Sequence, residues 1–374
     1  MLKSLYINNY RNLKELKINS LGNINLITGK NNTGKSSILE AIAIYASGAN
    51  MQIVNELLKE RGESLKSSVN NKNYISNNIK AISSLFNDRK IGFDVKDAIT
   101  IGSVEETLFG DENISEQRVS LRFIQYLDEI TRDNISNIST RKRTIVDFDQ
   151  KLDNLKIGIE IRNGRKSYIQ SIEDERIRFS NSLFDNNDNF EFIRTRNIDR
   201  DINSKLWDDI TLTEKEQYVI DALKIIEPFA ERIAFIEENT RERTAVIKLS
   251  NSSSIIPLRS MGDGINRILT IILALVNTDN GFLLIDEFEN GLHYTVQEKL
   301  WNIVFVLANK LGVQVFATTH SEDCILAFER ELNKKGNNFD GKLIRLDNDN
   351  GIIKQVEFSA RELKIANDND IEIR

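Results

Sequence analysis

The sequence predicts an α/β fold in which a mixed or parallel sheet is flanked by helices, and three apolar strands that end in polar residues indicate it. The first strand, 24–28, runs into a glycine-rich loop and a helical pattern. The second, 281–285, runs into two carboxylates, and the third, 313–319, ends at a histidine. Strands of this kind belong inside a parallel sheet, and ligands bind beyond their carboxyl ends. We therefore expect the three strand ends to meet at one site.

The loop after the first strand reads GKNNTGKS and fits the phosphate-loop pattern G-x-x-x-x-G-K-[ST]. Its glycines let backbone N–H groups turn toward a phosphate, and the following helix adds a partial positive charge. The spacing assigns Lys35 to the β- and γ-phosphates, with a catalytic role, and the Ser36 hydroxyl to Mg²⁺. An incidental glycine turn is the weaker alternative, given the strand before the loop and the helix after it. The residues expected to bind the nucleotide are Gly29, Asn31, Asn32, Thr33, Gly34, Lys35, Ser36 and Ser37.

Residues 281–290 read GFLLIDEFEN, so four apolar residues run directly into Asp286 and Glu287. Many strand ends look like this, but the phosphate loop upstream gives the pair a specific meaning. Asp286 is expected to bind Mg²⁺ through water, on the same metal as Ser36. Glu287 is the candidate general base that orients the attacking water.

The chain contains two histidines, His293 and His320. A lone histidine more often forms a structural hydrogen bond than it acts in catalysis. His320 ends the third strand and is the catalytic candidate, because from there it can donate to a γ-phosphate and sense its loss. For His293, in the segment ENGLHY, the functional and structural interpretations stay open.

A second candidate anion site opens the apolar helix that follows the segment RSMGDGINR. Ser260, Gly262 and Gly264 lie in this segment, and a serine with two glycines at a helix start can bind an anion. By itself the segment is a helix cap with a glycine-rich turn. Because one phosphate loop already holds one side of the nucleotide, we expect this segment to close on the nucleotide of a second subunit.

The rest of the chain is expected to divide into a core and an insert. Residues 1–46 and 190–374 form a discontinuous core in this prediction, and 47–189 form an inserted β-rich subdomain with helices. Helical spacing appears in 51–67 and 78–87, and strand-like alternation in 91–102, 118–127 and 155–163. Further expectations are a helix around 215–226, a second short helix at Pro228, a strand pair in 242–258, and a last strand pair before a charged tail.

Composition narrows the class of protein. The net charge of -6 gives no global basic field of the kind that attracts nucleic acid. Cys324 is the single cysteine, which excludes an internal disulfide and suits a reducing cytosol. The longest apolar run, 268–276, is too short to span a bilayer, so we expect a cytoplasmic protein without a membrane partner.

Taken in order, the segments NYRNLKEL, GKNNTGKSS, SMGDGINR, IDEFENGLHY and VFATTHSEDC resemble the ABC-type ATPases of the SMC/RecF superfamily. Within it, the chain resembles the stand-alone AAA family ATPases close to the ATPase part of the OLD (overcoming lysogenization defect) proteins. The resemblance covers 1–46 and 190–374 and implies a P-loop ABC-type ATPase head that uses ATP and Mg²⁺. Carried over by position, 29–37 is the Walker A loop, Asp286 and Glu287 are Walker B, 289–293 is the D-loop region, His320 is the switch histidine, and Ser260, Gly262 and Gly264 stand at the ABC signature.

The resemblance implies ATP hydrolysis by a head-to-tail homodimer that sandwiches two ATP molecules and can assemble further. It also implies a sensor or motor subunit of bacterial anti-phage defence or DNA maintenance. Departures are the signature S-M-G-D-G in place of LSGGQ, and a Q-loop position at which Arg194–Arg196 stand in for the glutamine. Too few residues follow His320 for the TOPRIM nuclease domain of OLD proteins, so a TOPRIM-like effector is expected on a separate chain.

Two alternatives of other classes stay open. One is a slow-turnover ATP switch or scaffold whose output is assembly. The other is a RecF-like repair ATPase that binds DNA directly, which the acidic charge balance disfavours.

Overall fold

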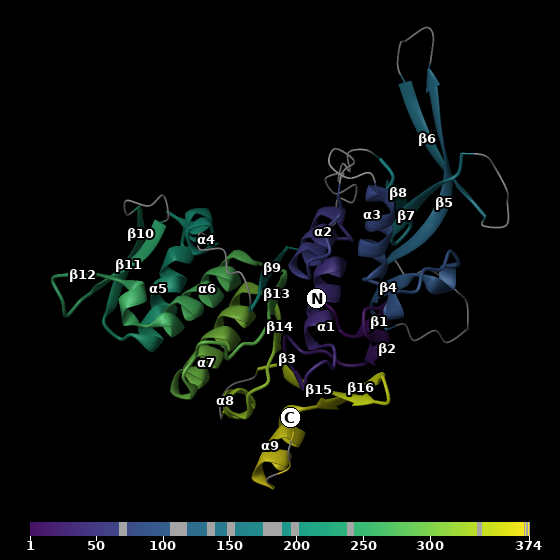
Figure 1. The fold of residues 1–374 in the computed structure, drawn as a ribbon. Helices are drawn as coiled ribbons and strands as arrows, with labels where there is room; N and C mark the ends of the chain where they lie inside the picture. The colour runs from purple at the N-terminus through teal and green to yellow at the C-terminus, as the bar shows by residue number, and fades with distance from the viewer. Residues whose placement is uncertain are drawn as a thin grey trace.

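The computed structural model describes residues 1–66, 73–104, 118–132, 139–147, 154–174, 189–195, 202–237, 243–334, 339–369, 371 and 373. Within these residues, two sheets lie on opposite sides of helix α1 (Lys35–Ala46), which contacts strands of both (Figure 1). Further helices cover the other face of the central sheet. The fold is therefore α/β, with a mixed sheet flanked by helices, as the sequence predicts.

The central sheet holds the three strands that the sequence analysis singled out. Its order is β16-β15-β3-β14-β13-β9, and every neighbouring pair is parallel except the hairpin β15–β16. The bounds are β3 (Ile24–Gly29), β9 (Phe190–Ile193), β13 (Phe282–Ile285), β14 (Gln314–Thr318), β15 (Gly341–Asp349) and β16 (Ile352–Phe358). Strands β3, β14 and β13 are neighbours and fully buried. The phosphate loop, the turn 318–321 (the histidine turn) and the turn 286–293 (the carboxylate turn) therefore leave the sheet side by side.

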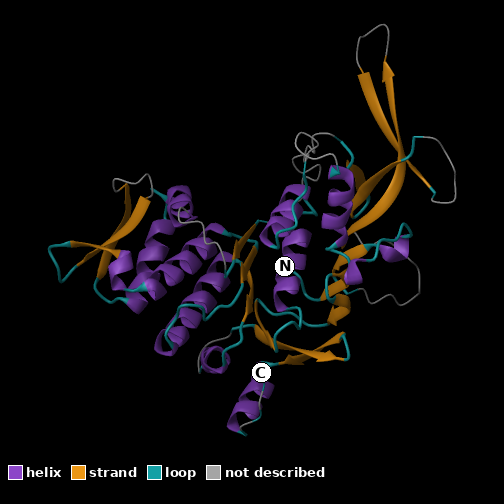
Figure 2. Cartoon of the chain, in the orientation of Figure 1, coloured by secondary structure: helices purple, strands orange, loops and turns teal. Residues whose placement is uncertain are grey.

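The second sheet is antiparallel and has the order β2-β1-β4-β5-β7-β8, with β6 paired to β5. Its strands are β1 (Leu5–Tyr10), β2 (Leu13–Ile18), β4 (Ile99–Gly102), β5 (Arg118–Arg132), β6 (Ser139–Val146), β7 (Lys156–Asn163) and β8 (Lys166–Ser171). The outer part of β5 forms with β6 a hairpin that projects from the molecule (Figure 2). Helices α2 (Met51–Glu60) and α3 (Tyr74–Ser83) and the 3-10 turns η2 (Asn87–Arg89) and η3 (Val95–Asp97) lie between β3 and β4 in the chain.

The predicted insert 47–189 does not form a sheet of its own, because β1 pairs with β2 on one edge and with β4 on the other. Unpaired backbone groups on the free edge of β1 would otherwise be exposed. Of the predicted strand 91–102, only 99–102 forms a strand, since a capping box between Asp94 and Asp97 turns residues 95–97 into η3.

The C-terminal half carries most of the helices. They are α4 (Ile202–Ile210), α5 (Lys215–Ile226), η4 (Leu258–Met261), α6 (Asp263–Asn277), α7 (Tyr294–Leu311), α8 (Glu322–Leu332) and α9 (Ala360–Asp368). A small antiparallel sheet of β10 (Ala230–Glu237), β11 (Arg243–Leu249) and β12 (Ile255–Pro257) packs beside α4 and α5. The predicted helix at Pro228 is therefore wrong: α5 ends at Ile226, before Pro228, and the chain pairs with β11 from Ala230 onward. The predicted charged tail contains α9, which Ser359 and Glu362 start with a capping box.

Two apolar cores hold the site in place. One packs α6, α7 and α8 against the central sheet and includes the stacked rings of Phe288 and Trp301, whose centroids lie 3.8 Å apart. The other fills the space around α1, between the two sheets. In the described parts of the chain, every helix is too short or too polar to traverse a bilayer.

Candidate active site: the phosphate loop and the carboxylate turn

The phosphate loop depends on two glycines with positive φ angles. Gly29 has φ +141°, and a Cβ there would collide with the carbonyl oxygen of Leu346. Gly34 has φ +92°, and a Cβ would come within 2.7 Å of the Leu13 side chain. L-residues rarely adopt such angles, so the two glycines of the motif fix the path of the loop into α1.

Lys35 lies folded back over this loop. Its Nζ donates to the carbonyl oxygens of Gly29 at 2.7 Å and Lys30 at 2.8 Å. Burial lowers the pKa of the Lys35 ammonium to about 8, although the carboxylates of the neighbouring turn act in the opposite direction. A phosphate would replace the two carbonyl contacts and favour the charged form.

Ser36 and Asp286, far apart in sequence, meet at the end of the central sheet. The Ser36 hydroxyl lies 3.1 Å from both carboxylate oxygens of Asp286. The hydroxyl of Thr318 donates to Asp286 Oδ1 at 2.7 Å, which fixes the carboxylate from the side of β14. A hydroxyl oxygen and a carboxylate, both of which suit Mg²⁺, thus lie next to each other in the two residues predicted to bind the metal.

The turn that follows Asp286 is strained at Glu287. Glu287 has φ +50°, a left-handed angle that is unfavourable for a residue with a side chain. Two hydrogen bonds to Thr318 stabilise it: the Glu287 N–H donates to Oγ1 at 2.8 Å, and the Phe288 N–H donates to the carbonyl oxygen at 2.9 Å. The candidate general base is thus anchored through its backbone to the neighbouring strand.

Arg267 of α6 contacts the same turn from the other side, and the sequence analysis did not single it out. Its Nη2 donates to the carbonyl oxygens of Asp286 at 2.8 Å and Glu287 at 3.2 Å, and its Nη1 donates to that of Arg194 at 3.2 Å. The side chain is buried, and desolvation lowers the pKa of its guanidinium despite the nearby carboxylates. A sequence signal existed, because an arginine in a helix of otherwise apolar core positions needs buried acceptors.

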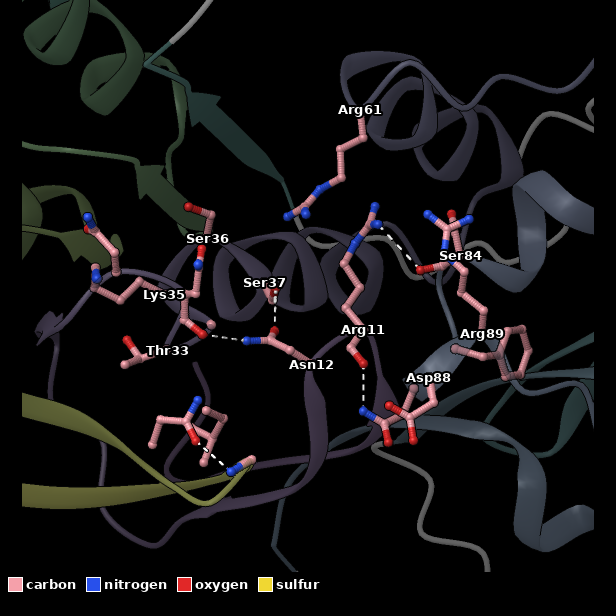
Figure 3. Close-up of a pocket in the computed structure, with 18 of the residues that line it drawn as sticks. Arg11, Asn12, Thr33, Lys35, Ser36, Ser37, Arg61, Ser84, Asp88 and Arg89 are labelled. Atoms are coloured by element: carbon pink, nitrogen blue, oxygen red, sulfur yellow. Dashed lines mark hydrogen bonds between the residues drawn. The ribbon is translucent and has the colours of Figure 1, made fainter.

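A cavity of about 870 Å³ opens in front of the phosphate loop (Figure 3). Residues 31–37 line one side, His320 contributes from the end of β14, and Asn348, Gly351 and Ile353 contribute from the β15–β16 hairpin. The pocket is large enough for a nucleoside triphosphate. His320 therefore stands at the phosphate-loop cavity, where the sequence analysis expected it.

The far end of the cavity carries three arginines beside Asp88, which sequence reasoning missed. Arg11, Arg61 and Arg89 line it, and Figure 3 shows Arg11 and Arg61 extending toward it from separate elements. Glu40 of α1 accepts from Arg11 at 2.7 Å and from Arg61 at 2.7 Å. Arg11 Nη2 is buried and has no hydrogen-bond acceptor among the described residues. In the sequence, the segment NYRN (9–12), at the end of β1, was the signal for this end.

The signature-like residues lie elsewhere. Ser260 is exposed and donates to the Pro257 carbonyl oxygen at 2.7 Å, and Gly262 is exposed with φ +106°. Gly264 packs so closely on the turn after β13 that a Cβ would lie 2.9 Å from the Gly291 carbonyl oxygen. None of the three lines the cavity described above.

His293 is a helix cap. Its Nδ1 accepts from the Thr295 N–H at 3.4 Å, and its ring lies against the exposed Tyr294. The structural interpretation of His293 accounts for these contacts. At the Q-loop position, Arg194 pairs with Glu60 and lies over the Phe192 ring, whereas Arg196 lies outside the described residues.

Comparison with known proteins identifies the class. A family model described as an AAA ATPase domain matches residues 1–325. The chain belongs to this AAA ATPase family. Among curated relatives, an ATP/GTP phosphatase of Helicobacter pylori is 24% identical and covers 99% of both chains. RecF, a DNA replication and repair protein of Caldanaerobacter subterraneus, is 40% identical over 60 residues, or 16% of each chain.

Among solved structures, an SMC head bound to the C-winged helix domain of ScpA superposes with a TM-score of 0.50 at 14% identity. It covers 96% of this chain and 98% of that chain. The fold of this AAA ATPase is thus that of an SMC head. The chain binds ATP and hydrolyses it.

Proposed function

We propose that hydrolysis takes place where the phosphate loop meets the carboxylate turn, in a head-to-tail homodimer that encloses two ATP molecules. The observation that carries the proposal is the contact between Ser36, which follows β3, and Asp286, which follows β13. This contact joins the end of the phosphate loop to the turn that carries the candidate base. The nucleotide-binding residues in this proposal are Gly29, Asn31, Asn32, Thr33, Gly34, Lys35, Ser36 and Ser37.

Ser36 and Asp286 would hold Mg²⁺. A hydroxyl and a carboxylate suit this hard cation, which usually takes few protein ligands and completes its shell with water and phosphate oxygens. The metal, when bound, neutralises charge on the β- and γ-phosphates. Lys35, now held by two backbone carbonyls, would turn to the same phosphates.

Glu287 would accept a proton from the attacking water and orient it toward the γ-phosphate. Its strained backbone is fixed by Thr318 and Arg267, which sets the point from which the side chain extends. His320 would donate to the γ-phosphate from the cavity wall and lose that contact when the phosphate leaves.

Ser260, Gly262 and Gly264 would act on the nucleotide of the second subunit. Ser260 and Gly262 are exposed and outside the cavity of their own chain, which supports a role across an interface. ATP binding would close the dimer, and hydrolysis would reopen it.

We also propose a biological setting from the motif resemblance to OLD-family ATPases. The dimer would be the sensor or motor of a bacterial anti-phage defence or DNA-maintenance complex, with a TOPRIM-like nuclease as its effector. The tagged Glu287→Gln protein, purified from its native host with ATP and Mg²⁺, tests this role. A nuclease that copurifies in fixed ratio supports it, and a homodimer alone contradicts it.

Three proteins test the chemistry: wild type, Glu287→Gln and Lys35→Ala. We expect Glu287→Gln to bind ATP, to accumulate as a dimer by light scattering, and to lose turnover. Lys35→Ala should lose both binding and dimerisation. Turnover by Glu287→Gln at the wild-type rate would contradict the assignment of the base.

A further inference from the structure

The carboxylate turn and the histidine turn are connected by four hydrogen bonds. Three of them use Thr318, which contacts Asp286, Glu287 and Phe288. The fourth hydrogen bond lies further along both turns, where the His320 N–H donates to Glu289 Oε1 at 2.8 Å. The turn that carries the candidate base Glu287 and the turn that carries His320 are therefore joined at two places.

The two carboxylate oxygens of Glu289 have different surroundings. Its other oxygen, Oε2, is buried and accepts no hydrogen bond among the described residues. The charge of Glu289 also favours the charged forms of Lys35 and Arg267, without a hydrogen bond to either. The one hydrogen bond that its carboxylate accepts among the described residues is therefore the bond from the His320 N–H.

The His320 imidazole has no side-chain hydrogen bond to any described residue, so no such bond holds the ring independently of the backbone. The backbone N–H of His320 has Glu289 as its acceptor. Its neighbours have other partners: the Thr319 N–H donates to the Ile27 carbonyl oxygen at 3.0 Å, and the Ser321 N–H donates to Thr319 Oγ1 at 3.0 Å. Loss of the Glu289 acceptor would therefore release the backbone at His320 itself, where the residue lines the cavity.

We infer that Glu289 is a positioning residue for His320: its carboxylate fixes the backbone of the histidine turn and so keeps the imidazole at the phosphate-loop cavity. The inference rests on the role proposed above for His320. It adds a residue that contacts no nucleotide atom itself and acts through another side chain.

A matched pair of variants separates the hydrogen bond from side-chain volume. Glu289→Gln keeps an oxygen acceptor, and Glu289→Met has a similar length but no such acceptor. We expect Glu289→Met to lower kcat by about 10- to 100-fold, with KM for ATP within about 3-fold of wild type, because a misplaced group affects the chemical step more than binding. Glu289→Gln should keep kcat within about 3-fold and melt no lower than wild type.

The control is Glu298→Met, which removes an exposed ion pair of α7 with Arg330. Wild-type kcat in Glu289→Met would overturn the inference.

A double-mutant cycle tests whether Glu289 acts through His320. If it does, Glu289→Met in a His320→Ala background lowers kcat no further. Additive losses mean that Glu289 acts on something else, and they overturn the inference.

Hydrogen exchange gives a readout that does not depend on turnover. The amide of His320 should exchange faster in Glu289→Met than in wild type, and at the wild-type rate in Glu289→Gln. Absence of ATP hydrolysis in the wild type would refute the proposed function and leave this exchange test intact. Unchanged exchange in Glu289→Met, with normal hydrolysis in the wild type, would refute the inference alone.

Discussion

The guanidinium of Arg267 donates to the carbonyl oxygen of Glu287 at 3.2 Å and to that of Asp286 at 2.8 Å. Arg267 belongs to α6, the helix that Gly262 and Gly264 open. One buried side chain thus connects the start of that helix with the carboxylate turn of the same chain. A displacement of α6 would therefore be transmitted to the backbone of the candidate base.

The first prediction concerns this connection. Arg267→Met should lower kcat by about 10- to 100-fold with a smaller change in KM, because the Glu287 turn loses the donor that opposes its backbone strain. Steady-state ATP hydrolysis measures the effect. Arg330→Met is the control, since Arg330 is exposed and its ion-pair partner among the described residues is Glu298, at 3.6 Å. Equal kcat in the two variants would contradict the prediction.

The second prediction concerns Thr318, whose hydroxyl both donates to Asp286 and accepts from the Glu287 N–H. Thr318→Val keeps the shape, leaves the Glu287 N–H without its acceptor and removes one donor to Asp286, which should lower the free energy of unfolding by about 1–3 kcal/mol. Thr318→Ser retains the hydroxyl and should lose less. Urea unfolding distinguishes them, and equal midpoints for both variants would refute the idea.

The third prediction is the pH dependence of ATP binding. Burial lowers the pKa of Lys35 to about 8, and bound phosphates would raise it. Affinity should therefore be constant below pH 8 and fall above it, by up to about tenfold per pH unit, as the free protein loses the proton that the complex retains. Titration calorimetry measures the profile. Lys35→Arg stays charged and should give a flatter one if it binds ATP.

The fourth prediction concerns Glu191 on β9. Burial, and then the charge of Asp209, raise the pKa of Glu191 from 4.5 to about 7. The folded state therefore binds the proton more tightly than the unfolded chain, so this group lowers stability progressively as the pH rises from 4.5 to 7. Glu191→Gln should raise the free energy of unfolding above pH 7 by about 1–3 kcal/mol and change it little near pH 4. An equal change at both pH values would argue against a raised pKa.

Much of the site could be predicted from local sequence. The Gly29–Ser36 loop, the Asp286–Glu287 pair and His320 each follow a buried strand, and such strand ends meet at one edge of a parallel sheet. The phosphate loop needed positive φ at two glycines, and the motif names both of them. Helix α1 begins at Lys35, where the pattern puts it.

Other parts of the fold depend on strand pairing between distant segments, which no local sequence pattern indicates. Pro228 precedes a strand instead of a helix because β11 offers an antiparallel partner. The region 47–189 shares a sheet with β1 and β2 because β1 had a free edge. Both outcomes depend on which chain segments are available for pairing.

The sequence by itself determined which residues could bind a triphosphate and activate water, because motif spacing and strand burial are properties of short segments. Only the tertiary structure decided what holds those residues. Arg267, Thr318 and Glu289 act through backbone groups of the two turns, and any residue type presents the same carbonyl and N–H there. Which side chain meets which backbone group is set by the packing of α6 and β14 around β13, and hence by contacts between distant parts of the chain.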